Sequence, residues 1–321
     1  MIDTRSWSQL SSLMLTAKRL TDGLYAGPHT ARHYGPGLDF HDYRAYVPGD
    51  DLSAVDWKLF GRTDRYYLKR YQRQTDLHLY LLVDVSASMR FAGLDRKGQQ
   101  IRSPQMLSKF DYVQQMAAAL AFLAIRQGDC IGVGLFDRGL IHHEPVAGSW
   151  AHLQRVIGVL ERAEPGNNAN VQTSTTKKSS SSAARASGGG GVGAAMAQAH
   201  ALLPRRGLVM ILSDFLDEPA SLFDGLNRLR HARFDVAAIA VLTPQERDLA
   251  AITATRLQMV DLETRDTVVT DVRMVAQRYQ QVFADHLDIV RQGCVGRGVD
   301  YALTTTNRPV IETLRGHLAP R

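Results

Sequence analysis

From residue 77 onward, short apolar runs alternate with longer amphipathic segments, and this alternation restricts the fold more than any other feature. Short continuous apolar runs predict buried strands, whereas apolar residues spaced three or four positions apart predict helices. We expect buried strands at residues 79–83, 129–136, 207–213 and 234–242, with helices between them. Such alternation predicts an α/β fold with a doubly wound, mostly parallel sheet.

Acidic residues follow two of these predicted strands directly. Asp84 ends the first apolar run and Asp214 ends the run 207–213, while Ser86 and Ser88 follow Asp84 at alternate positions. Right-handed crossovers bring the carboxyl ends of parallel strands to one edge of the sheet, where ligands of open α/β folds bind. Carboxylate and hydroxyl oxygens suit a hard cation such as Mg²⁺. The sequence therefore predicts a metal-centred docking site, without saying what docks there.

The N-terminal part has a different character. Residues 6–20 have helical spacing, and residues 37–76 contain a Pro-Gly turn and a run of β formers. We expect a first region at 1–76, with a helix and a small β-rich portion, and a second domain at 77–321. The clustered Asp50, Asp51 and Asp56 are interpreted as turn-capping acids rather than metal ligands.

A low-complexity tract interrupts the second domain. Residues 165–191 are rich in Ser, Thr, Asn and Gly, a composition that predicts a disordered loop. The spacing of Gly188, Gly190 and Gly193 matches a dinucleotide fingerprint, but no strand precedes it, as that fingerprint requires. Nucleotide binding is therefore not predicted here.

Composition excludes several other classes. The chain has 321 residues, 45% of them hydrophobic, with a net charge of +6. The basic residues are interpreted as a solvated surface, with a patch for an acidic partner around residues 58–73 as the next reading and nucleic acid as the third. Cys130 and Cys294 each lack a nearby second cysteine, so neither a cysteine zinc site nor a disulfide framework is expected. With no signal peptide and no run of about 20 apolar residues, we expect a cytoplasmic protein.

The order of an apolar strand, Asp84-x-Ser86-x-Ser88, and a later strand ending in Ser213-Asp214 resembles the metal-ion-dependent adhesion site of von Willebrand factor A domains. The resemblance implies that both serine hydroxyls bind the metal and that the acids bind it directly or through water. It also implies a loop threonine ligand and an open position for a partner's carboxylate. In this chain Gly190 stands where the threonine is expected, and Thr173, Thr175 and Thr176 lie further upstream.

The segment GLDFHDYRAYVPGDDLSAVDWKLFGRTDRYYLKRY, residues 37–71, resembles the hallmark of the domain-of-unknown-function family 58. The late segments VDLETRDTVVTD and VDYALTTTNRPVIETL are also similar to that family. The resemblance implies a von Willebrand A-like domain that works with a MoxR-type AAA+ ATPase in assembling, activating or remodelling client proteins. It implies a non-enzymatic adaptor whose Mg²⁺ is held by Asp84, Ser86, Ser88 and Asp214.

Two alternatives to a metal-dependent adaptor stay open at this point. One is an interaction platform without metal dependence, engaging acidic surfaces through the basic residues near 58–73. The other is a Mg²⁺-dependent phosphohydrolase with Asp84 as nucleophile, but Ser86 occupies the position of its general acid. The chain contains neither a Walker A motif nor a Gly-x-Ser-x-Gly elbow, so any ATPase activity is expected from a partner.

Overall fold

The computed structural model describes residues 11–25, 34–45, 57–72, 77–94, 106–167, 191–203, 206–249, 252, 256–263 and 266–318. The chain divides into two compact units. The larger contains residues 1–26 and 77–321, and the smaller contains residues 27–76. No helix in the described ranges has both the length and the apolar character needed to cross a bilayer.

The larger unit is built on a six-stranded sheet in the order β10-β7-β6-β3-β4-β5. The pairings β10·β7, β7·β6, β6·β3 and β3·β4 are parallel, and β5 joins β4 antiparallel at the edge. The strands are β3 (His78–Asp84), β4 (Cys130–Phe136), β5 (Leu140–Ala147), β6 (Leu208–Ser213), β7 (Asp235–Leu242) and β10 (Asp300–Thr305). The predicted doubly wound, mostly parallel sheet is confirmed.

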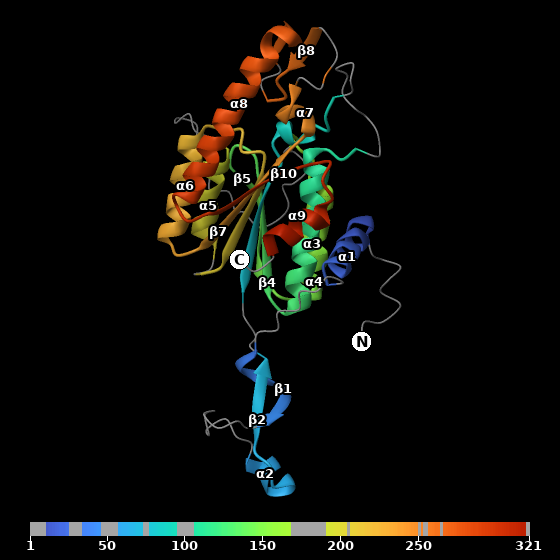
Figure 1. The fold of residues 1–321 in the computed structure, drawn as a ribbon, viewed down its shortest axis with the longest axis vertical. Coiled ribbons are helices and arrows are strands. Elements are labelled where there is room, and N and C mark those ends of the chain that lie inside the picture. The colour runs from blue at the N-terminus through green and yellow to red at the C-terminus, as the bar shows by residue number, and fades with distance from the viewer. Residues whose placement is uncertain are drawn as a thin grey trace. The chain divides into compact units, whose positions relative to one another are not determined.

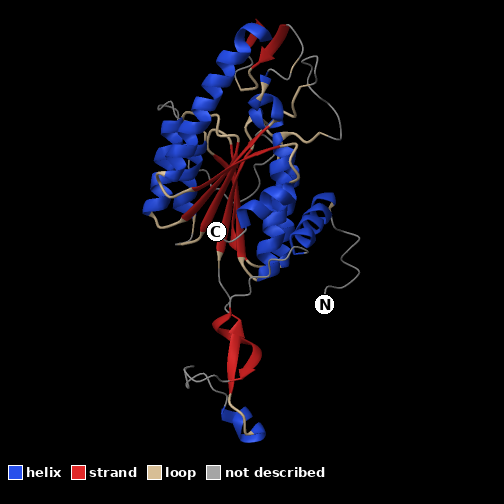
Figure 2. Ribbon diagram, in the orientation of Figure 1, coloured by secondary structure: helices blue, strands red, loops and turns tan. Residues whose placement is uncertain are grey.

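Helices cover both faces of this sheet (Figures 1 and 2). On one face lie α1 (Ser12–Tyr25), α3 (Lys109–Gln127), α4 (Trp150–Arg162) and α9 (Val310–Leu318). On the other lie α5 (Val192–Leu202), α6 (Pro219–His231) and α8 (Val272–Val295). Two short elements, η3 (Ala87–Arg90) and α7 (Pro244–Arg247), follow the carboxyl ends of β3 and β7.

The period of two along β3 divides its side chains between two hydrophobic cores. Leu79, Leu81 and Val83 belong to the core under α3, whereas Tyr80 and Leu82 belong to the core under α5 and α6. Successive side chains of a strand point to opposite faces, so a strand covered on both sides is apolar throughout. This explains why the run is continuous in the sequence rather than alternating.

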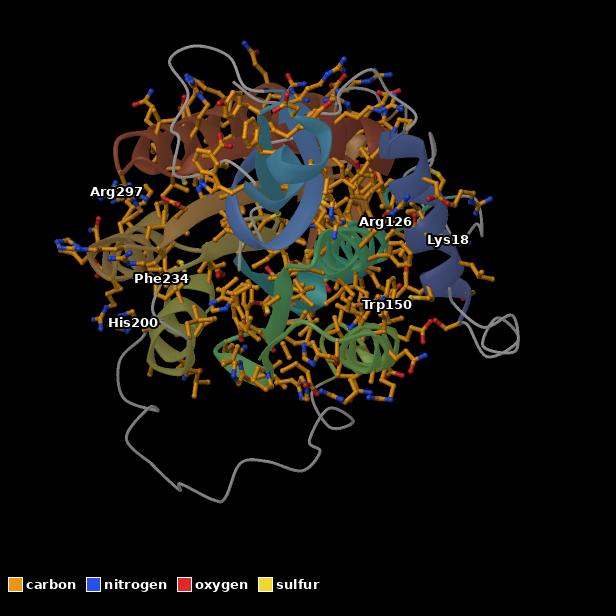
Figure 3. The ribbon with its side chains drawn as sticks, turned by 90° about the horizontal axis from the view of Figure 1, so that it is seen from below. Lys18, Arg126, Trp150, His200, Phe234 and Arg297 are labelled. Carbon is orange, nitrogen blue, oxygen red and sulfur yellow. The ribbon has the colours of Figure 1, made fainter. Side chains whose placement is uncertain are left out.

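The first helix packs with the larger unit. Leu13, Met14 and Ala17 of α1 are buried in the core that also contains α3 and α9. Arg126 of α3 reaches α1, where its guanidinium lies 2.8 Å from Asp22 Oδ1, and Figure 3 shows Arg126 beside Lys18 of α1. Helix α1 is part of the larger unit, and residues 27–76 form the smaller one.

The smaller unit contains two antiparallel strands, β1 (Tyr34–Ala45) and β2 (Tyr67–Gln72), with α2 (Trp57–Thr63) between them in the chain. The rings of Phe60 and Tyr66 stack with centroids 4.5 Å apart, and Trp57 meets both edge-on. Strand β1 begins at Tyr34, ahead of the predicted β-rich portion at 37–76. Asp50, Asp51 and Asp56 lie outside the described residues.

A late hairpin precedes α8. Its strands β8 (Arg256–Val260) and β9 (Thr267–Asp271) pair antiparallel. Leu249, Leu257 and Val272 bury their side chains in a small separate apolar cluster beneath it.

Gly193 has a packing role in α5. A Cβ at Gly193 would lie 2.1 Å from the carbonyl oxygen of Ser221, because α5 and α6 pack closely at this point. Gly225 of α6 faces the same contact, where a Cβ would lie 3.1 Å from the Gly193 Cα. The last glycine of the apparent dinucleotide fingerprint is therefore explained by helix packing.

Candidate docking site at the carboxyl edge of the sheet

The structure brings together the four residues proposed from the sequence. Strand β3 ends at Asp84, and Asp214 follows the last residue of the neighbouring strand β6. The Ser88 hydroxyl donates to Asp214 Oδ2 at 2.7 Å, and the Ser86 and Ser88 hydroxyl oxygens are 3.0 Å apart. Residues separated by 126 positions in the chain thus form one polar cluster, because adjacent parallel strands end at the same edge.

Asp84 has a positioning role within this cluster. Its Oδ1 accepts the Ser86 N–H at 2.8 Å, and its Oδ2 accepts the Ser213 hydroxyl at 2.5 Å. Burial raises the pKa of Asp84 to about 7, and the neighbouring charge of Asp214 adds to this, while the bonds from Ser213 and Ser86 oppose it. The carboxyl group therefore fixes the loop after β3 and ties it to β6.

Lys109, the first residue of α3, fills the centre of the site. Its Nζ lies 2.7 Å from Asp214 Oδ2 and 2.6 Å from Glu246 Oε1. The Lys109 side chain is 1% exposed, and that of Asp214 is 5% exposed. A buried ammonium between two carboxylates is therefore part of the edge that the sequence assigned to a metal ion.

The positions of Lys109 and Glu246 each follow from a helix cap. Ser108 and Asp111 form a capping box that starts α3, which places Lys109 in its first turn. Thr243 and Glu246 form a second capping box at α7, just after β7, in which Glu246 Oε2 accepts the Thr243 N–H at 2.7 Å. The other oxygen of Glu246 is then free to accept from Lys109. Three neighbouring strands, β3, β6 and β7, thus supply the acids of this edge.

The electrostatics favour the charged forms of the ion pair. Burial alone would lower the pKa of Lys109, but the attraction of Asp214 and Glu246 raises it above its ordinary value. Burial alone would raise the pKa of Asp214, but the charge of Lys109 and hydrogen bonds from Lys109, Ser88 and the Leu216 N–H lower it. Both shifts in pKa favour the ionised forms of Asp214 and Lys109.

An open cavity of about 550 Å³ adjoins the cluster. Ser88, Lys109 and Glu246 line its inner side, and the strand β8 and the residues after it form an outer wall. The Ser88 N–H donates to Glu263 Oε1 at 2.9 Å, which links the hairpin region to the loop after β3. Apolar side chains complete the lining, including Leu94, Leu249 and Met259.

The fit of a divalent cation depends on two opposing features. The oxygens of Ser86, Ser88 and Asp214 are donors that Mg²⁺ prefers. Lys109, however, already contacts Asp214 Oδ2 at 2.7 Å. An ion about 2.1 Å from that oxygen would lie within about 5 Å of the ammonium, where repulsion costs about 7 kcal/mol at an effective dielectric constant of about 20. The residues present do not fit a divalent ion while Lys109 holds this position.

As far as the chain is described, the acidic side chains of this edge do not by themselves form a metal-ligand cluster, a description that leaves out the hydroxyls of Ser86 and Ser88. Within the ranges that the structure describes, no group of three or more His, Cys, Asp or Glu side chains is arranged to hold a metal ion. Asp84, Asp214 and Glu246 converge on one edge, but their oxygens accept hydrogen bonds from Ser213, Ser88 and Lys109.

The loop expected to supply a threonine ligand is only partly described. Gly190, Thr173, Thr175 and Thr176 lie outside the described residues. At its described end, Gly191 has a φ of +97°, and a Cβ there would lie 2.0 Å from Asp217 Oδ2. The same carboxylate oxygen accepts the Val192 N–H at 3.1 Å, so Asp217 caps the start of α5.

Lys109 and Glu246 were not predicted from the sequence as residues of this site. Each carried a usable signal, since Ser108-x-x-Asp111 and Thr243-x-x-Glu246 have capping-box spacing next to predicted apolar elements. A lysine in the first turn of a helix also opposes the helix dipole, which favours negative charge there. Such a lysine requires nearby carboxylates, and the two strand ends supply them.

Comparison with known proteins agrees with the resemblance found in the sequence. The model of the family described as "Protein of unknown function DUF58" matches residues 42–288. The chain is 27% identical over 250 residues to Uncharacterized protein Rv1480 of Mycobacterium tuberculosis and to Uncharacterized protein Mb1516 of Mycobacterium bovis. Each match covers 77% of this chain and 68% of the relative.

Two solved structures also match part of the chain. Conserved hypothetical protein BatB from Bacteroides thetaiotaomicron is 14% identical, with a TM-score of 0.41 over 76% of this chain and 97% of that one. The SpRpn10 VWA domain is 7% identical, with a TM-score of 0.37 over 76% of this chain and 95% of that one.

Proposed function

Since the chain belongs to the DUF58 family, whose function is unknown, we propose that it is a non-enzymatic adaptor that docks partner proteins at the carboxyl edge of its sheet. By the family resemblance, its partner is a MoxR-type AAA+ ATPase, and the pair assembles, activates or remodels client proteins. One observation supports the docking face most directly: the polar cluster of Asp84, Ser86, Ser88 and Asp214 adjoins, through Ser88, a cavity of about 550 Å³ at this edge.

The proposal takes the metal-independent form of the adaptor. The metal-dependent form requires a divalent ion at Asp84, Ser86, Ser88 and Asp214, where the buried ammonium of Lys109 supplies positive charge instead. A phosphohydrolase that uses Asp84 is disfavoured for a separate reason. Both carboxyl oxygens of Asp84 accept hydrogen bonds from the protein, and the residue is 4% exposed, so neither oxygen is presented to a substrate.

A binding experiment tests the docking face. Val260 lines the cavity and is 49% exposed, whereas Val295, at the far end of α8, is 62% exposed and does not line it. We expect Val260→Lys to weaken co-elution of a purified MoxR-type ATPase with the tagged chain, because it places a charge at the apolar edge of the docking face. Val295→Lys is the matched control and is expected to bind as the wild type does.

The same experiment, repeated with Mg²⁺ and with EDTA, separates the two forms of the adaptor. Equal co-elution in both conditions is expected for the metal-independent form, whereas loss in EDTA would support the metal-dependent one. Equal binding by Val260→Lys and the wild type would refute the docking face. Absence of co-elution with the wild type would refute the partner.

A further inference from the structure

The ion pair of Lys109 differs in its surroundings from other pairs in the described part of the chain. Arg126–Asp22 has side chains 43% and 50% exposed, and Arg291–Asp288 has side chains 57% and 62% exposed. Lys109 and Asp214 are 1% and 5% exposed at a similar distance of 2.7 Å. Exposed pairs contribute little, whereas a buried charge must be matched closely to be tolerated.

A positive charge at the position of Lys109 destabilises the fold unless carboxylates pair with it. The Lys109 side chain is buried, and its place in the first turn of α3 sets it against the positive end of the helix dipole. Burial and the dipole both oppose a cation at this position. Asp214 Oδ2 at 2.7 Å and Glu246 Oε1 at 2.6 Å offset these costs, so the two carboxylates form a site built around one positive charge.

Other contacts hold these carboxylates in place. Asp214 accepts the Ser88 hydroxyl at 2.7 Å and the Leu216 N–H at 3.3 Å, and Glu246 is fixed by the capping box at α7. The two acceptor oxygens therefore converge on one point because of interactions that do not involve Lys109. A point bounded by two preorganised carboxylates and adjoining the Ser88 hydroxyl has the ligand chemistry of a hard-cation site.

We infer that the Lys109 ammonium is a built-in cation that occupies a latent divalent-metal site between Asp214 and Glu246, so that this edge of the sheet is assembled without a metal ion. The inference deepens the proposed function by naming what holds the docking face together. It is independent of the partner's identity.

Removing the ammonium tests this directly. Lys109→Ala leaves two carboxylates facing each other across a space the size of the missing side chain, so we expect a lower melting temperature in EDTA. Added MnCl₂ or MgCl₂ should then raise the melting temperature in a saturable manner. Binding only to the folded state increases the ratio of folded to unfolded protein about 100-fold when the ion reaches about 100 times its Kd. The wild-type melting temperature should be the same in Mn²⁺ and in EDTA.

Two control variants separate a specific site from general effects of salt. Lys109→Ala combined with Asp214→Asn lacks one carboxylate, so Mn²⁺ should not restore its melting temperature. Glu246→Gln keeps the ammonium beside Asp214 and should respond to Mn²⁺ no more than the wild type does. Direct titration of Mn²⁺ by electron paramagnetic resonance on the wild type needs no variant, and there the free-ion signal should match that of buffer.

Saturable Mn²⁺ binding by the wild type would overturn the inference, because the ion would then bind with Lys109 in place. A folded Lys109→Ala variant whose melting temperature does not change with Mn²⁺ would also overturn the inference, because the two carboxylates would then not form a cation site. Neither readout contains a partner protein. Failure of ATPase co-elution would therefore count against the proposed function alone.

Discussion

The first prediction concerns the coupling energy between Lys109 and Asp214. Their charged atoms are 2.7 Å apart, which corresponds to about 6 kcal/mol of attraction at an effective dielectric constant of about 20. Desolvation of both groups offsets much of this attraction. We expect Lys109→Met and Asp214→Asn each to lower the free energy of unfolding by about 3–5 kcal/mol, because each leaves a buried charge with a poorer partner.

The double variant should be less destabilised than the sum of the single variants. Once one of the two charges has been removed, replacing the other removes a buried charge that has lost its partner. We therefore expect a coupling energy of about 2–3 kcal/mol between Lys109 and Asp214. Urea denaturation followed by circular dichroism, with the four proteins measured at one pH and ionic strength, supplies the cycle.

A second cycle on Arg126 and Asp22 is the matched control. That pair has nearly the same separation, 2.8 Å, but its side chains are 43% and 50% exposed. We expect a coupling energy below about 1 kcal/mol, falling as salt is added. Additivity within about 0.5 kcal/mol for Lys109 and Asp214 would refute the assignment of a strong buried pair, and so would equal coupling in both cycles.

Three further predictions concern the rest of the larger unit. Gly193→Ala should lower the free energy of unfolding, measured in urea, by about 1–3 kcal/mol, because its Cβ would lie 2.1 Å from the Ser221 carbonyl oxygen. In the control variant Gly158→Ala, in α4, the Cβ would contact only the flexible end of Arg162 at 3.4 Å. That variant should instead raise the free energy of unfolding by up to about 1 kcal/mol. Tyr80→Phe removes a 2.6 Å hydrogen bond between the Tyr80 hydroxyl and His143 Nδ1, and should lower the free energy of unfolding by about 1 kcal/mol in the same assay. An unchanged free energy of unfolding would mean that water replaces the hydroxyl. Burial lowers the pKa of His143, so the neutral side chain contributes to stability above its ordinary pKa of about 6.5, and this contribution is lost as the pH falls through the lowered value. The urea midpoint of His143→Gln should therefore fall less between pH 7.5 and pH 5.5 than that of the wild type. An equal fall in both proteins would contradict this.

Much of the larger unit could be predicted because its information is local. Residues 79–83 are apolar on both faces, and that pattern alone fits a strand covered by helices on both sides. Asp84 and Asp214 could be placed together for a similar reason, since topology brings the carboxyl ends of parallel strands to one edge. Neither conclusion needs knowledge of a side-chain contact.

The ion pair at this edge could not be predicted in the same way. Lys109 is 105 positions from Asp214 and 137 positions from Glu246, and periodicity does not state which charges meet at such separations. The helix containing Lys109 was expected, but its first residue faces the site only because the capping box at Ser108 fixes where α3 begins. The packing of α1 on α3 could not be predicted for a similar reason, because amphipathic spacing shows that one face of a helix is buried but not which element buries it.

The difference between an ammonium and a metal ion determines how a partner can be recognised. A divalent ion with an open coordination position can bind a partner's carboxylate, whereas the Lys109 ammonium is 1% exposed and already contacts two carboxylates of its own chain. If Lys109 holds the edge, a partner cannot complete the coordination of a central charge. Recognition must then depend on what the edge presents to solvent, namely the partly buried Ser86 and Ser88, the exposed Glu263 and the apolar lining of the cavity. Binding should accordingly be sensitive to the shape of that cavity and insensitive to chelators.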